Sequence, residues 1–389
     1  MKVLYIGVYR DGTGWGQAAI DYILSLDAAG VEVVPRALKL NGRQHVPPER
    51  VLELESKSSR GCDVVVQHVL PHQMDYNGRM FNVGLFASET SDFRASVWPD
   101  RLNCMDKVVV INRQQAEAAR RSGVTVPIYV VPHATDISRF QRSYEPLESL
   151  RPYKERGDFL FYFIGEMVRR KNLAALLKAF HLEFDPSEPV QLVIKTDRPG
   201  LPPDESRRHV EAFCNEIKRG LKLHGGKVEH YKEEVVITDR LTDQGMMRLH
   251  ATCDCFVLPS YGEAWAIPAF DAMAMGKTPI VTACTGFLDY LSDSEGWLVR
   301  CHEEPVFGVN DTFEDLFVGS ESWSAVDISH MRRCMRDAYE KESLRKEKAT
   351  NGIAKAYDFS YGVIGPVLKK ALENEAGIER GKALDGASR

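Results

Sequence analysis

The sequence lacks the marks of several protein classes. No run of apolar residues approaches the roughly 20 that a membrane-spanning helix needs, and the apolar stretch at residues 3–8 runs into Arg10-Asp11 too soon for a signal peptide. The formal net charge is -5, so no overall basic field attracts nucleic acid or anionic lipid. We therefore expect a cytoplasmic protein without a nucleic-acid partner, whose membrane contact, if it has one, is peripheral and at the inner face.

Metal-binding and disulfide patterns are also absent. The eight cysteines are scattered and form no Cys-x-x-Cys pair, and Cys253 and Cys255 have no second pair at metal-ligand spacing. Several cysteines lie in apolar runs, where a thiol behaves as a small hydrophobic group. The sequence therefore predicts reduced core cysteines, no metal site and no cofactor.

What the chain does have is enough apolar sequence for two cores. It is 389 residues long, with 44% hydrophobic and 27% charged residues, and single cores stop growing at about 250–300 residues. We predict an N-terminal domain over residues 1–148 and a second domain over 149–357. A C-terminal helix over 358–389 is expected to pack back toward the first domain and to end in a frayed tail. The polar stretch 142–157 is the expected linker.

Short apolar runs alternate with helical patterns in both halves, which indicates parallel sheets. Strands are expected at residues 3–8, 31–34, 64–66, 83–86, 108–111, 128–131, 159–164, 192–194, 235–237, 255–258 and 279–282. Helices are expected at 114–121, 210–223, 246–251 and 269–275. Two more are expected, one after the glycines at 12–16 and one after Asn172, which can cap a helix. Each half is therefore predicted to be a doubly wound α/β domain, and ligands commonly bind between such domains.

The segment from Ser260 to Gly276 carries the first candidate site. Pro268 fits the first turn of a helix, so residues 263–267 are expected to present backbone N–H groups at the positive helix end, which suits an anion. Glu263 and Asp271 are eight positions apart and can accept hydrogen bonds from the hydroxyl groups of one ligand. The alternative is that Glu263 solvates a loop and Asp271 favours the helix start through its dipole.

The segment from Gly165 to Asn172 carries the second candidate site. It joins a strand to a helix and contains three consecutive cations at positions 169–171. Cations are unfavourable near the positive end of a helix, so their placement here needs a reason, and a bound diphosphate would supply one. A solvated basic turn is the alternative interpretation.

The glycines at positions 12–16 form the third candidate site. Glycine lets a backbone approach phosphate groups closely. The stretch is a poor nicotinamide-binding fingerprint, because the third glycine of that motif falls on Gln17. A simple tight turn is the alternative.

Together these segments resemble one family, the group-one, family-four glycosyltransferases of the GT-B fold. Glu263 to Asp271 is similar to the family's Glu-x7-Glu motif, and Gly165 followed by Lys171 resembles its diphosphate-binding turn. Residues 131–136 and 63–68 resemble stretches near the domain link and in the acceptor domain. The resemblance covers most of the chain and implies two Rossmann-like domains that face each other across a cleft.

The resemblance implies transfer of a sugar from a UDP- or GDP-sugar to a glycan, lipid-linked or small-molecule acceptor, with retention of anomeric configuration. No Asp-x-Asp triplet occurs anywhere in the chain, so the metal–diphosphate bridge of the other large glycosyltransferase fold has no ligands, and protein cations would replace it. The catalytic candidates that it implies are Lys171 and Glu263, and, on the acceptor side, His68 and Glu89. The donor-binding candidates are Gly14, Arg170, Lys171, Lys195, Glu263, Ala264, Trp265, Ala266, Ile267 and Asp271.

Several residues depart from the family pattern. Asp271 is one methylene shorter than the usual Glu, and Glu166 stands where Arg is frequent. Ala264 and Ala266 replace glycines of the loop. On the acceptor side, His68 has a second interpretation as a core histidine at a strand end.

Other functions fit parts of the sequence. A related GT-B epimerase or phosphorylase would share the phosphate pocket, and a non-catalytic nucleotide-sugar-binding protein would explain the departures at Glu166 and Asp271. A transferase acting on modified DNA is disfavoured by the net charge of -5.

Overall fold

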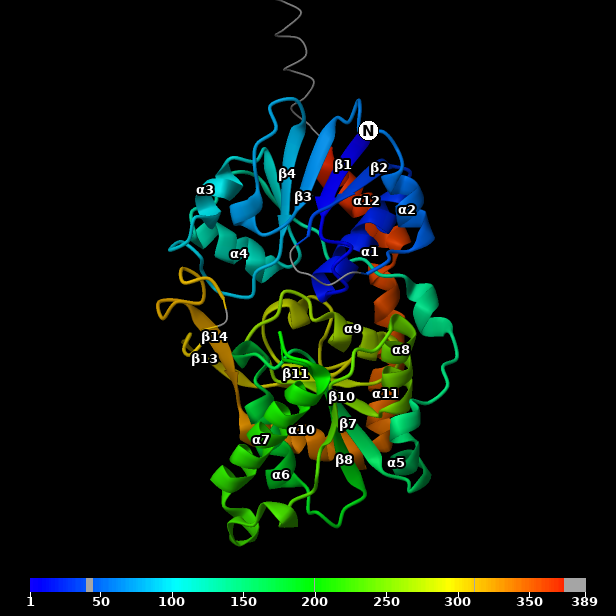
Figure 1. The fold of residues 1–389 in the computed structure, drawn as a ribbon, viewed down its shortest axis with the longest axis vertical. Coiled ribbons are helices and arrows are strands. Elements are labelled where there is room, and N and C mark those ends of the chain that lie inside the picture. Colours follow the sequence, from blue (N-terminus) through cyan, green and yellow to red (C-terminus); the bar gives the residue numbers. More distant parts are fainter. Residues whose placement is uncertain (40–44, 199, 311, 374–389) are drawn as a thin grey trace, which may run out of the picture. The chain divides into compact units, whose positions relative to one another are not determined.

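Figure 1 shows the computed structural model of the chain, which describes residues 1–39, 45–198, 200–310 and 312–373. The frayed tail expected at the C-terminal end lies outside these residues. Contacts divide the chain into two compact units. The first comprises Met1–Ala87, Ser96–Asp136 and the chain from Asp358, and the second comprises Ser88–Ala95 and Ile137–Tyr357.

The first unit is built on a parallel sheet of six strands in the order β2-β1-β3-β4-β5-β6. These are β1 Lys2–Gly7, β2 Glu32–Ala37, β3 Val64–His68, β4 Phe81–Phe86, β5 Lys107–Val110 and β6 Ile128–Val130. Strands β3 and β5 are buried at every position, as expected for a parallel sheet covered on both faces. The strand order reverses between β1 and β3, where α/β sheets of this kind bind ligands beyond the carboxyl ends of the strands.

The helices of the first unit include one from the C-terminal end of the chain. They are α1 Gly14–Ala28, α2 Glu49–Glu55, α3 Trp98–Asn103, α4 Arg113–Arg121 and α12 Tyr361–Leu372. Helix α12 packs so closely on α1 that a Cβ atom on Gly365 would lie 2.2 Å from the carbonyl oxygen of Ser25. Because no residue with a side chain permits that approach, Gly365 allows the C-terminal helix to dock on the first unit.

The second unit repeats the architecture with a parallel sheet in the order β12-β11-β10-β7-β8-β9. Its strands are β7 Phe159–Ile164, β8 Val190–Lys195, β9 Val235–Ile237, β10 Cys255–Leu258, β11 Pro279–Thr282 and β12 Trp297–Val299. An antiparallel ribbon follows, formed by β13 Cys301–Pro305 and β14 Ser322–Val326. The strand order of the large sheet reverses between β7 and β10, so the loops after these two strands meet at its switch point.

The second unit has its own set of helices, several of which pack on this sheet. They are α5 Arg151–Glu155, α6 Leu173–Glu183, α7 Pro203–Leu221, α8 Asp243–Thr252, α9 Ile267–Ala274, α10 Ile328–Glu340 and α11 Glu342–Ala356. In α6 the buried side chains include Leu173, Leu176, Leu177 and Phe180, the face that the helical spacing predicts. The predicted α/β class, with two doubly wound parallel sheets, is confirmed.

Three local predictions were wrong. Gly14 belongs to the first turn of α1 rather than to a loop, because the Thr13 hydroxyl accepts a 3.1 Å hydrogen bond from the Gly16 amide and caps the helix earlier. Asn172 has a left-handed backbone with φ of 53°, and its side chain makes no capping hydrogen bond. Helix α7 begins at Pro203 rather than at residue 210, because proline suits its first turn.

The limits of the two units also differ from the expected bounds. The chain passes into the second unit at Asp136–Ile137, and the expected linker at 142–157 contains the short helix α5. Residues Ser88–Ala95, which follow β4 in sequence, belong to the second unit. Of the helices in the described ranges, none combines the length and the apolar character that a membrane crossing requires.

Candidate active site

The candidate site of the second unit lies at the switch point of its sheet. Strands β7 and β10 are neighbours in that sheet, and each is followed directly by a candidate segment: Gly165–Asn172 after β7 and Ser260–Ile267 shortly after β10. The Tyr261 amide donates a 2.9 Å hydrogen bond to the carbonyl oxygen of Arg170. The two segments, almost a hundred residues apart in sequence, are therefore held side by side.

Glu263 is the centre of an ion cluster formed by these segments. Its Oε1 accepts hydrogen bonds from the Ser260 hydroxyl at 2.6 Å and the Lys171 ammonium at 2.7 Å, and Nη1 of Arg170 lies 3.0 Å from the same oxygen. The Glu263 side chain is 4% exposed. Among the described residues no donor contacts Oε2, so this oxygen remains available to a ligand.

Glu263 is ionised over the whole physiological pH range. Burial alone would raise the pKa of its carboxyl group, but the charges of Arg170 and Lys171 and the hydrogen bonds from Lys171 and Ser260 outweigh burial. Together they lower the pKa from 4.5 to about 2. The site therefore presents a fixed negative charge held between two cations.

Arg170 joins this cluster to a second carboxylate. Its guanidinium donates to the carbonyl oxygen of Gly262 at 2.7 Å and lies 3.0 Å from Oε1 of Glu89. Burial acts to lower the pKa of Arg170, but the charges of Glu263 and Glu89 raise it by more than burial lowers it. The net shift is upward, so the guanidinium stays charged. Glu89, which we expected on the acceptor side, is thus part of the second unit and a partner of Arg170.

Lys171 retains donors for a ligand. An ammonium group has three N–H donors, and in the described part of the chain Glu263 is the acceptor recorded for it. The side chain is 15% exposed. Lys171 can therefore hold Glu263 and an anionic group at the same time.

The start of helix α9 adds backbone donors beside the cluster. Ala266 precedes the helix with φ of 65°, a left-handed conformation, and no described residue accepts a hydrogen bond from the amides of Ala266 or Ile267. Pro268 lies in the first turn, as predicted. Two available amides at the positive end of a helix favour an anion.

Residues 264–266 form a closely packed loop. Ala264, Trp265 and Ala266 are all under 9% exposed. A Cβ atom on Gly286 would lie 2.1 Å from the carbonyl oxygen of Ala264, so glycine is required there. The close packing fixes the direction of the amides at the helix start.

Asp271 lies in the middle of α9 and is ion-paired with a residue that the sequence did not indicate. Arg139 places Nη2 2.9 Å from Oδ2 of Asp271, which is buried. Nothing in the pattern around Arg139 points to a carboxylate 132 positions later. A ligand hydroxyl bound by Asp271 would share that carboxylate with Arg139.

Tyr290 is a second residue that the sequence did not indicate. It is buried against Trp265, with ring centroids 4.8 Å apart, and no described residue bonds its hydroxyl group. Burial raises the pKa of Tyr290, and the charges of Glu263 and Asp271 raise it further. Both acids therefore lie near one neutral, available hydroxyl group.

Lys195 adjoins the Gly165 turn at the end of β8. It pairs with Ile164 in the sheet, its carbonyl oxygen accepts from the Gly165 amide at 3.1 Å, and its side chain is buried. The second unit thus brings Glu89, Arg170, Lys171, Glu263 and the loop before α9 together, with Lys195 beside the same turn.

His68 and Gly14 belong to the first unit. His68 is the last residue of β3. Its Nδ1 and the Tyr5 hydroxyl form a 2.7 Å hydrogen bond, and its ring stacks on Trp15 with ring centroids 5.4 Å apart. Burial and then the charge of His133 lower its pKa to about 3, so it is neutral at physiological pH. A Cβ atom on Gly14 would meet no atom within 4 Å, which leaves space beside its backbone.

The described residues contain no group of three or more His, Cys, Asp or Glu side chains arranged to hold a metal ion.

Similarity to known proteins agrees with this geometry. Residues 158–307 match the model of the family described as glycosyl transferases group 1. Over 222 residues the chain is 23% identical to the serotype-specific mannosyltransferase WbdA of Escherichia coli, a match that covers 56% of this chain and 22% of that protein. The chain thus spans about a fifth of the length of the curated relatives it matches.

Solved structures share the fold over nearly the whole chain. The sucrose-phosphate synthase of Thermosynechococcus elongatus superposes with a TM-score of 0.66 at 15% identity, covering 95% of this chain and 98% of that one. HepE of Anabaena, in complex with UDP and glucose, superposes with a TM-score of 0.65 at 14% identity, covering 96% and 99%. The predicted GT-B fold is confirmed.

Proposed function

We propose that this chain, whose residues 158–307 match the group 1 glycosyl transferases, transfers a hexose from a UDP- or GDP-sugar to a hydroxyl group of an acceptor. The bond between the anomeric carbon and the diphosphate oxygen breaks, and that carbon bonds to the acceptor oxygen. The acceptor hydroxyl loses its proton, and the nucleoside diphosphate leaves. The observation that carries the proposal is the pairing of Arg170 and Lys171 with Glu263 at the switch point of the second sheet.

The cations act on the leaving group. Negative charge grows on the diphosphate as its bond to the sugar breaks, and in this proposal Lys171, Arg170 and the amides of Ala266 and Ile267 stabilise it. The pairing of both cations with Glu263 and the helix start at Ile267 support this role. Such preorganised donors need no rearrangement in the transition state, and loss of one commonly costs about 10²–10³ in kcat. Gly14, whose backbone is accessible, is a further candidate to approach the phosphates.

The acids act on hydroxyl groups of the donor. Oε2 of Glu263 would accept from the sugar, and Asp271 from the ribose, while Ala264 and Trp265 shape the pocket. Lys195 would reach the donor from the end of β8. UDP is favoured as the nucleotide because the structural neighbour HepE binds UDP and glucose, and mannose is a candidate sugar because WbdA is a mannosyltransferase.

Retention of configuration and independence of metal are part of the proposal. The first is supported by the resemblance of the Glu263–Asp271 motif to a retaining family. The second is supported by the two cations at the phosphate position, since they supply the charge that a metal ion would otherwise provide. His68 stays part of the proposal as an acceptor-side residue, although it is 1% exposed and bonded to Tyr5, as a core histidine would be. The acceptor is proposed to be a glycan, a lipid-linked sugar or a small molecule.

A ligand-binding assay with a matched variant tests the donor site. UDP, GDP and their hexose conjugates are added to the wild-type chain, to Lys171→Ala and to Lys178→Ala, and thermal unfolding is followed. Lys178 lies in the second turn of α6, which begins at Leu173 after the ion cluster. We expect one nucleotide family to raise the Tm of the wild type and of Lys178→Ala, and to lose most of this effect in Lys171→Ala. Equal stabilisation of both variants would show that the phosphate site lies elsewhere.

Turnover separates this proposal from its competitors. Release of the nucleoside diphosphate from the sugar conjugate in the presence of an acceptor mixture supports a transferase. Tight binding without turnover across many acceptors indicates a non-catalytic sugar-nucleotide sensor. Sugar transfer from a sugar phosphate without a nucleotide donor indicates a phosphorylase, and formation of an isomeric sugar indicates an epimerase.

A further inference from the structure

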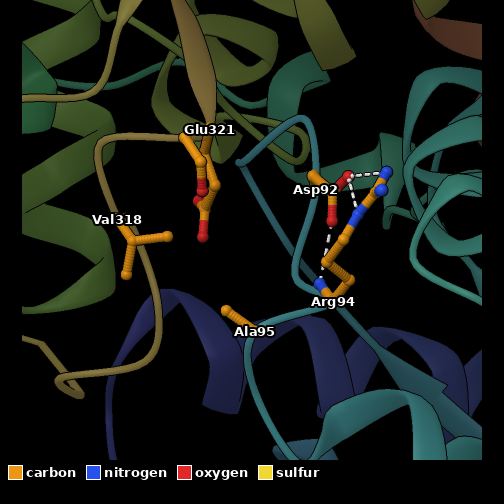
Figure 2. A pocket seen from close by; sticks show the side chains of 6 residues that line it. Asp92, Arg94, Ala95, Val318 and Glu321 are labelled. Carbon is orange, nitrogen blue, oxygen red and sulfur yellow. Dashed lines mark hydrogen bonds and ion pairs between the residues drawn. The ribbon is translucent and has the colours of Figure 1, made fainter.

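The second unit contains a polar pocket apart from the cluster around Glu263. Two chain segments form its walls, and the cavity holds about 250 Å³. Figure 2 shows the side chains that face it, which are Asp92, Arg94, Ala95, Val318, Ser320 and Glu321. All of these residues belong to the second unit.

Glu321 is the buried group of this pocket. Its side chain is 3% exposed, and its Oε2 accepts hydrogen bonds from the Thr90 hydroxyl and from the Phe317 amide at 3.1 Å. No described residue contacts Oε1. In Figure 2 the carboxyl group points into the space between Val318 and Asp92. A buried oxygen without a donor is costly, so a ligand donor at Oε1 would be stabilising.

The rest of the wall combines donors, acceptors and small apolar surfaces. Nε of Arg94 lies 2.8 Å from Oδ2 of Asp92, and this pair stands at the exposed side of the pocket. Ser320 adds an exposed hydroxyl group, while Val318 and Ala95 present methyl groups. A pyranose ring has hydroxyl groups at its edge and C–H groups on its faces, and these match both kinds of surface.

The size and charge of the pocket favour one sugar ring over a nucleotide or a phosphate. Pockets for drug-sized molecules hold about 300–1,000 Å³, so a cavity of about 250 Å³ suits one sugar ring rather than a whole nucleotide sugar. Two carboxyl groups against one guanidinium disfavour a phosphate. An uncharged, hydroxyl-rich ring remains the best fit.

Both walls are tied to the cluster around Glu263. Glu89 contacts Arg170 at 3.0 Å, and it precedes Asp92 by three residues, which span at most about 11 Å of extended chain. On the other wall, Trp323 follows Glu321 by two residues and stacks on Tyr261 with ring centroids 4.1 Å apart. The pocket therefore lies within a few sugar lengths of the proposed donor site.

We propose that this pocket is a subsite for one monosaccharide ring of the acceptor, with Oε1 of Glu321 hydrogen-bonded to a ring hydroxyl. The proposal rests on the proposed function, since it assigns the acceptor as a glycan. It predicts weak, saturable binding of a free glycoside by the chain in the absence of a nucleotide.

Ligand-observed NMR with methyl α-mannopyranoside and methyl α-glucopyranoside tests the subsite. Four versions of the 389-residue chain are compared: wild type, Glu321→Gln, Ala95→Trp and Ala354→Trp. Ala95 is exposed at the pocket, so an indole there fills the cavity without disturbing the core, and Ala354 is an exposed alanine on α11 that serves as the matched control. Binding of UDP and GDP is measured on the same samples.

The expected result is millimolar binding of at least one glycoside by the wild type and by Ala354→Trp. Ala95→Trp abolishes this binding, and Glu321→Gln weakens it about tenfold, the loss expected for one hydrogen bond to a charged group. Nucleotide binding stays unchanged in all four chains, which also shows that the variants fold.

Three results would overturn the subsite. These are glycoside binding that is equal in all four chains, no glycoside binding by the wild type, and calcium binding that Glu321→Gln abolishes while no glycoside binds. Failure of the proposed function has a different signature, because there the wild type would bind no nucleotide, whatever the glycosides do.

Discussion

The ion cluster around Glu263 makes a quantitative prediction about stability. The pKa of Glu263 is about 2 against its ordinary value of 4.5, and each pKa unit corresponds to about 1.36 kcal/mol. With the cost of burial included, the ionised form of Glu263 therefore contributes a net stabilisation of about 3 kcal/mol to the second unit at neutral pH. The side chain is almost fully buried, so solvent screens this interaction little. The substitution Glu263→Gln should therefore lower the free energy of unfolding at pH 7 by about 3 kcal/mol.

The pH dependence of that loss is the sharper test. Because the folded pKa is depressed, the stabilisation is complete above about pH 5 and is lost as the pH falls through 4.5 toward 2. At about pH 3.2 roughly half of it remains, so the difference between wild type and Glu263→Gln should fall to about 1.5 kcal/mol.

Urea unfolding of the wild type, Glu263→Gln and Glu229→Gln at a series of pH values measures this difference. Glu229 is exposed, so its replacement should change stability by less than about 0.5 kcal/mol at every pH. A loss below about 1 kcal/mol for Glu263→Gln at pH 7, or a loss that is the same at pH 7 and pH 3.2, would refute the assignment of Glu263 as a buried ion between two cations.

Three further predictions concern the loop and the chemistry. Ala266→Gly should stabilise the chain by about 1 kcal/mol, because Ala266 has a left-handed φ of 65° that glycine adopts without strain; an unchanged or lower Tm would contradict the strain. Gly286→Ala should lower the free energy of unfolding by about 3 kcal/mol or more and weaken nucleotide binding, because the added Cβ would lie 2.1 Å from the Ala264 carbonyl oxygen. If this variant unfolds in urea and binds nucleotide like the wild type, the loop before α9 is not held as closely as proposed. EDTA should change the initial rate of sugar transfer less than about twofold if protein cations carry the phosphate charge, and restoration of a lost rate by added magnesium would contradict that.

Periodicity in the sequence was sufficient to predict most strands. The strand expected at 279–282 is β11, and those at 235–237 and 255–258 are β9 and β10. Each is a short apolar run, and such runs form buried parallel strands because the sheet is covered on both faces. The structure also brings the motif at Glu263 into contact with the cations at 170–171, because loops after neighbouring strands meet at a switch point.

The contacts that the sequence did not reveal join residues far apart in the chain. The Arg139–Asp271 pair and the Glu89–Arg170 pair depend on where Ile137–Gln141 and Ser88–Ala95 lie in the second unit. Neither segment has a periodic pattern, so local sequence cannot predict its position. The backbone conformation of Asn172 was also not predicted. An asparagine before a helix usually caps it with its side chain, but Asn172 has a left-handed φ of 53° and makes no such hydrogen bond.

The most direct test of the donor site compares a nucleoside with its diphosphate. Calorimetric titration of the wild type and Lys171→Ala with UDP and uridine, or with GDP and guanosine, isolates the contribution of the phosphate groups. We predict that Lys171→Ala weakens the diphosphate at least about tenfold, the loss expected for one hydrogen bond between charged groups, and leaves the nucleoside unchanged. An equal preference for the diphosphate in both chains would contradict the claim that the cations beside Glu263 receive it.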